Sequence, residues 1–274
     1  MEVNNFVIDY QGKGTWISLV PVGDIHLGDK NCDVKYFEKL VDWVLEDDKR
    51  YVIGMGDYGN YIVPSDASRY DSTVVDIKYA SPEEQFKKIL KTFQPLAEKN
   101  KIIGFHTGNH EEEMRKRHYF DFTRNMCHTL KVPYLGWNAI TSLSFNRLSS
   151  TGGKCNSNNL ILYSTHGFGS GFRRGSKVNK LEDLASFVDA DIYLMGHNHD
   201  IFSTRTIQLR LSKGKKSPGK IIERKRVFAC TGTMLRGYAA GVTSYIERKG
   251  YQPHKIGVIK VKIKPYTKDI HVSE

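Results

Sequence analysis

The sequence of 274 residues has few cysteines and prolines and lacks long apolar runs. Its four cysteines are scattered without a Cys-x-x-Cys pair, which indicates neither a disulfide framework nor a thiolate zinc site. Eight prolines and a charged fraction of 26% argue against a disordered or fibrous chain. No apolar run reaches the roughly 18 residues that a membrane-spanning helix needs, and the first residues do not have the pattern of a signal peptide. We therefore expect a globular, cytoplasmic protein without a membrane partner, and its oligomeric state stays open.

Acidic residues are scarce in the last quarter of the chain. Residues 201–274 contain 17 Lys and Arg against 4 Asp and Glu, a net charge of +13. Residues 1–200 contain 24 basic and 26 acidic side chains, a net charge of −2. A basic surplus of this size favours an anionic partner such as DNA or RNA, although a solvated lysine-rich face is its commoner cause. Part of the surplus lies in an expected hairpin tip at residues 212–220.

Strand and helix patterns alternate along the first two-thirds of the sequence. Short aliphatic runs predict five buried strands, at residues 16–22, 51–55, 101–105, 160–164 and 191–195. Apolar residues at spacings of three and four predict helices at 33–50, from Ser81 until Pro95 disturbs the pattern, and more weakly at 120–130 and 178–188. This alternation predicts an α/β domain with its functional groups at the carboxyl ends of the strands.

The pattern changes after His199. Strand-like segments follow at residues 201–211, 220–231 and 256–263, and no convincing helix lies between them. Residues 60–80 have no clear period and are expected to form a long loop of the kind that is often functional. No linker divides the chain, so we expect a single domain over residues 1–274 with a basic, β-rich part from about residue 201.

A short polar motif stands at the end of each of the five expected strands. The motifs are Gly23-Asp24-Ile25-His26, Gly56-Asp57-Tyr58-Gly59-Asn60, Gly108-Asn109-His110-Glu111, Thr165-His166-Gly167 and Gly196-His197-Asn198-His199. Each alone is more typical of a turn with a hydrogen-bonded side chain, but five such motifs at five successive strand ends are hard to attribute to coincidence. Imidazoles, carboxylates and an amide oxygen are the ligands that two adjacent divalent ions need.

The order of these motifs resembles the calcineurin-like metallophosphoesterase superfamily over about Trp16 to His199. The resemblance implies a four-layer α/β (α+β) fold, in which two mixed β-sheets pack as a sandwich flanked by helices, with a dinuclear metal site at the carboxyl ends of strands. It implies one ion held by Asp24, His26 and His199, a second held by Asn109, His166 and His197, and Asp57 bridging them. The implied cofactors are two divalent ions, Mn in the first place and Zn, Fe, Ni or Mg as alternatives. A hydroxide that bridges them would attack phosphorus.

The same resemblance suggests catalytic roles around His110, which would polarise the phosphate or protonate the leaving oxygen. Asn60 stands where some relatives have an acid that holds this histidine, and Glu111 is an alternative partner, although an acid at a helix start explains Glu111 equally well. In the glycine-rich stretch 167–175, Arg173 and Arg174 would bind substrate phosphate, with phenylalanines available for base stacking. A flexible surface loop explains that stretch equally well.

Substrate class follows from features beside the metal motifs. The arginines that phosphoprotein phosphatases carry around their Gly-Asn-His-Glu and Gly-Asp motifs are absent, which disfavours a protein phosphatase. The start Asp24-Ile25-His26-Leu27-Gly28 resembles the nuclease branch. We therefore predict a hydrolase of phosphodiester bonds in nucleic acid or a nucleotide, with the phosphoester substrate as its partner. A phosphomonoesterase for a small metabolite or a protein and a non-catalytic binding scaffold on the same fold remain open alternatives.

Overall fold

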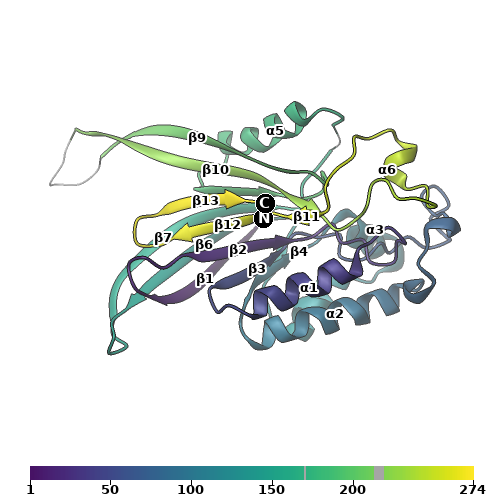
Figure 1. Ribbon diagram of the computed structural model, residues 1–274, viewed down its shortest axis with the longest axis horizontal. Coiled ribbons are helices and arrows are strands. Elements are labelled where there is room, and N and C mark those ends of the chain that lie inside the picture. Colours follow the sequence, from purple (N-terminus) through teal and green to yellow (C-terminus); the bar gives the residue numbers. More distant parts are fainter. Residues whose placement is uncertain (170, 213–218) are drawn as a thin grey trace.

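Two β-sheets form the centre of the computed structural model, which describes residues 1–169, 171–212 and 219–274 (Figure 1). The strands of the first sheet are β1 (Glu2–Gln11), β6 (Asn138–Leu148), β7 (Lys154–Thr165), β8 (Ile192–Met195), β9 (Ile201–Leu211), β10 (Ile221–Thr233) and β11 (Gly257–Val258). The strands of the second sheet are β2 (Ile17–Val22), β3 (Arg50–Gly54), β4 (Ile102–His106), β5 (Tyr134–Gly136), β12 (Lys260–Lys264) and β13 (Asp269–Ser273).

Both sheets are mixed. The first has the order β1-β6-β7-β8-β10-β11, with β9 paired to β10, and the second has the order β13-β12-β2-β3-β4-β5. Strands β2, β3, β4 and β5 run parallel, as do β7, β8 and β10, whereas β6 and β7, β9 and β10, and β2 and β12 are antiparallel. Parallel neighbours bring their carboxyl ends to one edge of a sheet, so the polar motifs that follow them can meet there.

Helices flank the two sheets, except for the last one, which lies at one end of the molecule (Figure 1). They are α1 (Val34–Leu45), α2 (Pro82–Glu98), α3 (Asn109–His118), α4 (Phe122–Leu130), α5 (Arg174–Asp183) and α6 (Tyr245–Arg248), with short 3₁₀ turns at Ser72–Val74, Ile77–Tyr79 and Leu184–Ser186. Helices α1 and α2 lie on the side of the second sheet, and α5 lies on the side of the first (Figure 1). Among the described residues, no helix combines the length and apolar character that crossing a bilayer requires.

Three apolar clusters separate the four layers. One joins α1, α2 and α4 to the second sheet, a second lies between the sheets, and a third joins the first sheet to α5. Strand β8 shows the alternation that produces them, because Ile192 and Leu194 belong to the cluster between the sheets while Tyr193 and Met195 belong to the outer one. The predicted four-layer sandwich of two mixed sheets is therefore confirmed.

Local signals set the helix starts as expected. The Asp33 side chain accepts a hydrogen bond from the backbone N–H of Tyr36 and caps α1, and Ser81 with Glu84 forms a capping box at α2. The expectation that Pro95 disturbs α2 is wrong, because the helix continues to Glu98. Pro95 lies in the last turns, where its missing N–H removes a single helical hydrogen bond.

The chain after His199 contains two elements that the sequence did not predict, helix α6 and strand β13. Strands β9 and β10 pair over the expected ribbon, but the tip residues 213–218 lie outside the described residues. Helix α6, a single turn capped by Ser244, corrects the expectation that no helix lies in this part. It belongs to a long segment between β10 and β11 that borders the site described next.

Candidate metal centre

Three of the predicted ligands meet where β2 and β8 end. Asp24 and His26 follow β2, and His199 follows β8. The His26 Nε2 atom lies 3.0 Å from His199 Nε2, which in turn lies 3.3 Å from Asp24 Oδ1. These three side chains form the first ligand group.

A second group meets beyond β4, β7 and β8. Asn109 begins α3 directly after the turn that follows β4, His166 follows β7 and His197 follows β8. The Asn109 Oδ1 atom lies 3.1 Å from His166 Nε2 and 2.8 Å from His197 Nδ1. One amide oxygen therefore faces two ring nitrogens.

Asp57 lies between the two groups, after β3. Its Oδ2 atom is 3.4 Å from His166 Nε2 in the second group and 4.0 Å from His26 Nε2 in the first. Its Oδ1 atom accepts a hydrogen bond of 2.9 Å from the backbone N–H of His110. The structure thus brings all seven predicted ligands together, with the single shared carboxylate in the middle.

The spacing of the donor atoms fits divalent cations. Two ligand atoms that each lie ~2.1 Å from one ion are about 3.0–3.4 Å apart at octahedral or tetrahedral angles. The facing atoms of His199 and Asp24 are 3.3 Å apart, and those of His166 and Asn109 are 3.1 Å apart. The Asp24 Oδ1 atom is also buried without a hydrogen-bond partner, which is costly for a carboxylate oxygen unless a cation contacts it.

The backbone at the ligands is in the left-handed region. The φ angles are 47° at Asp24, 53° at His26, 52° at Asp57, 65° at His197 and 51° at His199. Each such residue costs about 1 kcal/mol relative to ordinary backbone, and residues of this kind cluster at functional sites. The unusual conformation is thus adopted by the ligand residues themselves and not only by neighbouring glycines.

A glycine is needed at one point of close approach. A Cβ atom placed on Gly108 would lie 2.1 Å from Asp57 Oδ1, which is far inside van der Waals contact. Any side chain at this position would displace the shared carboxylate, so Gly108 lets α3 start directly against Asp57.

Burial and neighbouring charges shift the pKa values of the ligand side chains in different directions. Burial alone would raise the pKa of Asp57, but His166 and His110 nearby hold the pKa of this carboxyl well below its usual range. Burial alone would lower the pKa of His166, but the Asp57 carboxylate raises it to about 9. Burial lowers the pKa of His26 and of His197, so both rings are neutral near pH 7. A divalent ion would therefore meet the Asp57 carboxylate, two neutral imidazoles and, at His166, a ring that must lose a proton.

Glu111 does not hold His110. Its carboxylate accepts hydrogen bonds from the backbone N–H groups of four residues, at 2.9 Å from Asp57, 2.8 Å from Tyr58, 3.4 Å from Gly59 and 3.0 Å from Gly108. The suggested role of Glu111 as partner of His110 is thus corrected, because both carboxylate oxygens are engaged with the backbone that carries the ligands.

His110 instead uses a backbone partner. Its Nδ1 atom forms a short hydrogen bond with the carbonyl oxygen of Asn60, so Asn60 contributes its backbone rather than its side-chain amide. The His110 ring packs edge-on against His26 at a centroid distance of 4.7 Å. One ring nitrogen of His110 also lies within 4.8 Å of the facing atoms of Asp57 and His26. His110 therefore reaches the centre and has a fixed orientation.

The two predicted substrate arginines lie in different settings. Arg174 forms an ion pair of 3.1 Å with Asp200, directly after His199, and its guanidinium lies 5.9 Å from the Phe202 ring. Arg173 precedes α5 and is exposed, and its side chain makes no hydrogen bond or ion pair within the described residues. Arg173 is thus free to contact an anion, whereas Arg174 would have to share its charge with Asp200.

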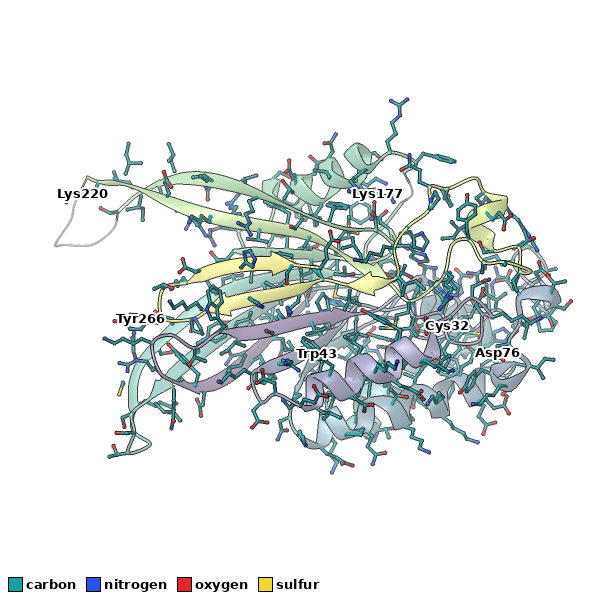
Figure 2. All side chains as sticks on the ribbon, in the orientation of Figure 1. Cys32, Trp43, Asp76, Lys177, Lys220 and Tyr266 are labelled. Carbon is teal, nitrogen blue, oxygen red and sulfur yellow. The ribbon has the colours of Figure 1, made fainter. Side chains whose placement is uncertain are left out.

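Two residues near the metal centre were not predicted from the sequence as part of the site. The His254 ring lies 5.9 Å from the His199 ring, and its Nε2 atom is bonded to the carbonyl oxygen of Leu235 at 2.9 Å. Lys177, labelled in Figure 2, places its Nζ atom 3.2 Å from the carbonyl oxygen of Asn198. For His254 the available signal was the length of the unpatterned stretch between β10 and β11, which a compact domain rarely carries without a function.

Comparison with known proteins gives structural neighbours but no sequence relatives. No family model and no curated protein matches the chain. A predicted phosphoesterase from Streptococcus pneumoniae TIGR4 has 15% identity and a TM-score of 0.36, and the match covers 91% of this chain and 84% of that one. The calcineurin-like phosphoesterase YfkN from Bacillus subtilis has 13% identity, a TM-score of 0.38 and coverages of 84% and 92%. A metallophosphoesterase from Sphaerobacter thermophilus has 11% identity, a TM-score of 0.35 and coverages of 94% and 89%.

Overlaps of this size do not by themselves establish what the chain does. Its chemistry must be inferred from the order of the five motifs and from the convergence of their side chains.

Proposed function

We propose that this protein is a metal-dependent phosphoesterase that hydrolyses phosphodiester bonds in nucleic acid or a nucleotide. The observation that carries the proposal is the position of Asp57, whose Oδ2 atom lies 3.4 Å from the second ligand group and 4.0 Å from the first. A carboxylate shared between two sets of imidazole and oxygen donors is the arrangement expected of a two-ion site. Two divalent ions bound there, with Mn as the first choice, would supply Lewis acidity and an activated water.

The residues of the chain hold the donors in place before any substrate arrives. Asp24 and Asp57 supply negative charge, and the neutral rings of His26 and His197 present lone pairs without an electrostatic penalty. Glu111 fixes the backbone of Asp57 through its hydrogen bonds, so the shared carboxylate needs little reorganisation.

His110 is the residue best placed to act on the phosphate itself. Its Nδ1–H is oriented by the Asn60 carbonyl, and within the described part of the chain its Nε2 atom forms no hydrogen bond. The His110 ring is within reach of the centre, and its free nitrogen can donate a proton to a phosphate oxygen or to the leaving oxygen. A positioned group of this kind contributes about 10²- to 10⁴-fold to the rate.

A diester of nucleic acid is favoured over a small monoester by the charge around the centre. Arg173, Arg174 and Lys177 lie in or just before α5, beside the residues that follow His199. Cations outside a metal centre suit a substrate whose further phosphates extend beyond the bond that is cleaved. Arg174 and Lys177 are already paired with Asp200, so Arg173 is the cation that a small monoester would leave without a partner.

The proposal is tested with the full chain after chelation and reloading with Mn²⁺. Rates are measured on bis-p-nitrophenyl phosphate, on p-nitrophenyl phosphate and on labelled single-stranded and double-stranded DNA, with EDTA as the metal-free control. We expect Mn²⁺-dependent hydrolysis of diesters that the Asp57→Asn variant lacks. The matched control is Asp42→Asn, which removes one carboxylate from the exposed face of α1 and should leave the rate unchanged.

Each competing function predicts a different result in the same assay. Faster hydrolysis of p-nitrophenyl phosphate than of every diester would replace the proposal with a phosphomonoesterase. Metal binding without hydrolysis of any ester would support a binding scaffold. Full activity in the presence of EDTA would overturn the metal-dependent chemistry altogether.

A further inference from the structure

The segment between β10 and β11 borders the metal centre through contacts with three other parts of the chain. His254 packs against His199 at a ring distance of 5.9 Å. Arg248 forms an ion pair with Asp71 in the long loop after β3. A third contact joins this segment to the loop that follows the ligand His166, and it is made by aromatic rings.

Three aromatic side chains form this contact, and we call them the aromatic rim: Phe172, Tyr245 and Tyr251. The Phe172 ring lies 5.0 Å from the Tyr251 ring, and the Tyr251 ring lies 6.1 Å from the Tyr245 ring. Phe172 is 60% exposed and Tyr245 is 58% exposed, so their mutual packing leaves much of the apolar surface in water. Rings that gather but remain open in this way are typical of a binding surface.

The rim is held in place by its supports rather than by burial of its own rings. The carbonyl oxygen of Tyr251 accepts a hydrogen bond of 2.7 Å from the Tyr238 hydroxyl, and the Tyr251 N–H donates to the Ile246 carbonyl at 3.0 Å. Ile246 is buried and anchors the turn, and Ser244 caps α6. Because the backbone of the rim is already fixed in this way, binding of a ligand there orders little of the protein and costs little conformational entropy.

The charge around the rim suits an anion. Residues 171–180 contain four Lys and Arg and no acid, and residues 245–255 contain three Lys and Arg and one acid. Asp200 pairs with Arg174 and Lys177, and Asp71 pairs with Arg248, so the two stretches together with these two acids have a net charge of +4. Lys249 lies over the Tyr245 ring, with its Nζ atom 5.8 Å from the ring centroid. Aromatic faces combined with cations are the features by which proteins bind unpaired bases and their phosphates together.

We propose that the aromatic rim stacks an unpaired nucleobase of the substrate while a phosphate of the same strand lies at the metal centre. The inference rests on the proposed phosphodiesterase function and names its substrate as a nucleotide or a single-stranded nucleic acid. In a duplex both faces of each base are covered by neighbouring bases, so a duplex offers the rim no free face except at its ends. His254 connects the two sites, since it belongs to the same segment as Tyr251 and packs on His199.

The inference is tested by binding in EDTA, where no hydrolysis occurs. Fluorescence anisotropy gives the Kd of the full chain for three probes of equal phosphate number: an oligothymidylate, an abasic oligomer and a self-paired hairpin. One stacked base contributes about 5- to 150-fold in Kd. We expect the wild type to prefer the oligothymidylate over both other probes by about tenfold, toward the lower end of that range.

Variants of the rim separate stacking from general charge attraction. Tyr251→Leu and Phe172→Leu should each remove most of the preference for bases and leave binding of the abasic oligomer within about twofold, because phosphate contacts are untouched. Tyr251→Phe keeps a ring and should retain the preference. The matched control is Tyr266→Leu, at the end of the molecule opposite Asp76 (Figure 2), which should behave as the wild type.

The outcomes distinguish this inference from the proposed function. Equal affinity of the wild type for the oligothymidylate and the abasic oligomer, or an unchanged preference in both leucine variants, overturns the stacking role even if the protein hydrolyses diesters. A base preference that depends on the rim supports the inference even in an assay that finds no hydrolysis, in which case only the proposed function fails.

Discussion

Replacement of Glu111 by glutamine tests how the metal centre is held together. The Glu111 side chain is 1% exposed, and its Oε2 atom accepts from the backbone N–H groups of Asp57 and Gly108, while Oε1 accepts from Tyr58 and Gly59. Glutamine keeps one acceptor oxygen and puts an NH₂ group in place of the other. Two buried N–H groups would then face a donor.

The expected loss of stability follows from the number of buried N–H groups that lose their acceptor. Each buried N–H that loses its acceptor costs about 1–3 kcal/mol, so Glu111→Gln should lower the free energy of unfolding by about 2–6 kcal/mol. At about 2–4 °C per kcal/mol for a chain of this size, the Tm should fall by roughly 5–20 °C. Because the same N–H groups position Asp57, metal affinity should fall by about 10- to 100-fold.

The measurement is best made near pH 8. Burial and the neighbouring Asp57 charge raise the pKa of Glu111 to about 7, and the comparison should be made where the group is a carboxylate. Urea unfolding and metal titration of the wild type and the variant give both quantities. Glu113→Gln is the matched control on the same helix, since Glu113 is paired with Arg117 at the surface and should change stability by less than about 1 kcal/mol. If Glu111→Gln unfolds at the same urea concentration as the wild type, the four hydrogen bonds do not support the centre as argued.

Three further predictions concern the site. Asp57→Asn should remove most activity and at least one bound ion, and metal analysis that finds one ion in a fully active wild type would contradict the shared role. His110→Ala should keep both ions and lose about 10²- to 10⁴-fold in rate on DNA but less on an aryl diester, whose leaving group hardly needs a proton; equal losses would point to phosphate binding instead. The His166 pKa of about 9 exceeds its unfolded value of 6.5, so the proton stabilises the fold fully below pH 6.5 and this contribution is lost as pH rises through 9. Metal must displace that proton, so affinity should rise with pH across this window and titration calorimetry at pH 7.5 in two buffers should show proton release; a pH-independent affinity would show that His166 binds no ion.

The strands that precede the ligands and the starts of helices α1 and α2 could be predicted because their signals are local, whereas the helical pattern did not indicate α3, which carries Asn109. A run such as Ile192–Met195 is apolar enough to identify β8, and Asp33 and Ser81 mark helix starts through hydrogen bonds to residues three positions on. The ligand positions follow from the same logic, since the ends of parallel strands lie at one edge. This reasoning located the five motifs, and the resemblance to the calcineurin-like superfamily indicated which seven of their residues are the candidate ligands.

The roles of Glu111 and Asn60 could not be predicted correctly from the sequence. Glu111 binds the N–H of Asp57, which is 54 positions away in the sequence, and His110 binds a backbone carbonyl that every residue type would offer. Both contacts use a backbone group, so the types of the residues in the sequence do not reveal either of them. The aromatic rim was missed in part for a related reason, because it joins Phe172 to a segment whose only sequence signal is the lack of a regular pattern.

The strained backbone at the ligands shows why the centre has to be understood as one unit. Five left-handed residues at about 1 kcal/mol each amount to ~5 kcal/mol, a large share of the roughly 5–15 kcal/mol that stabilises a typical domain. Hydrogen bonds between different motifs offset this strain: the Asp24 N–H binds the Gly56 carbonyl at 2.9 Å, and the His197 N–H binds Asp24 Oδ2 at 2.8 Å. Each motif is therefore held in its unusual conformation by another motif that is distant in the sequence. An isolated Asp-x-His or Gly-His-x-His segment has no such support, so it is the combination of motifs that gives the ligands their geometry.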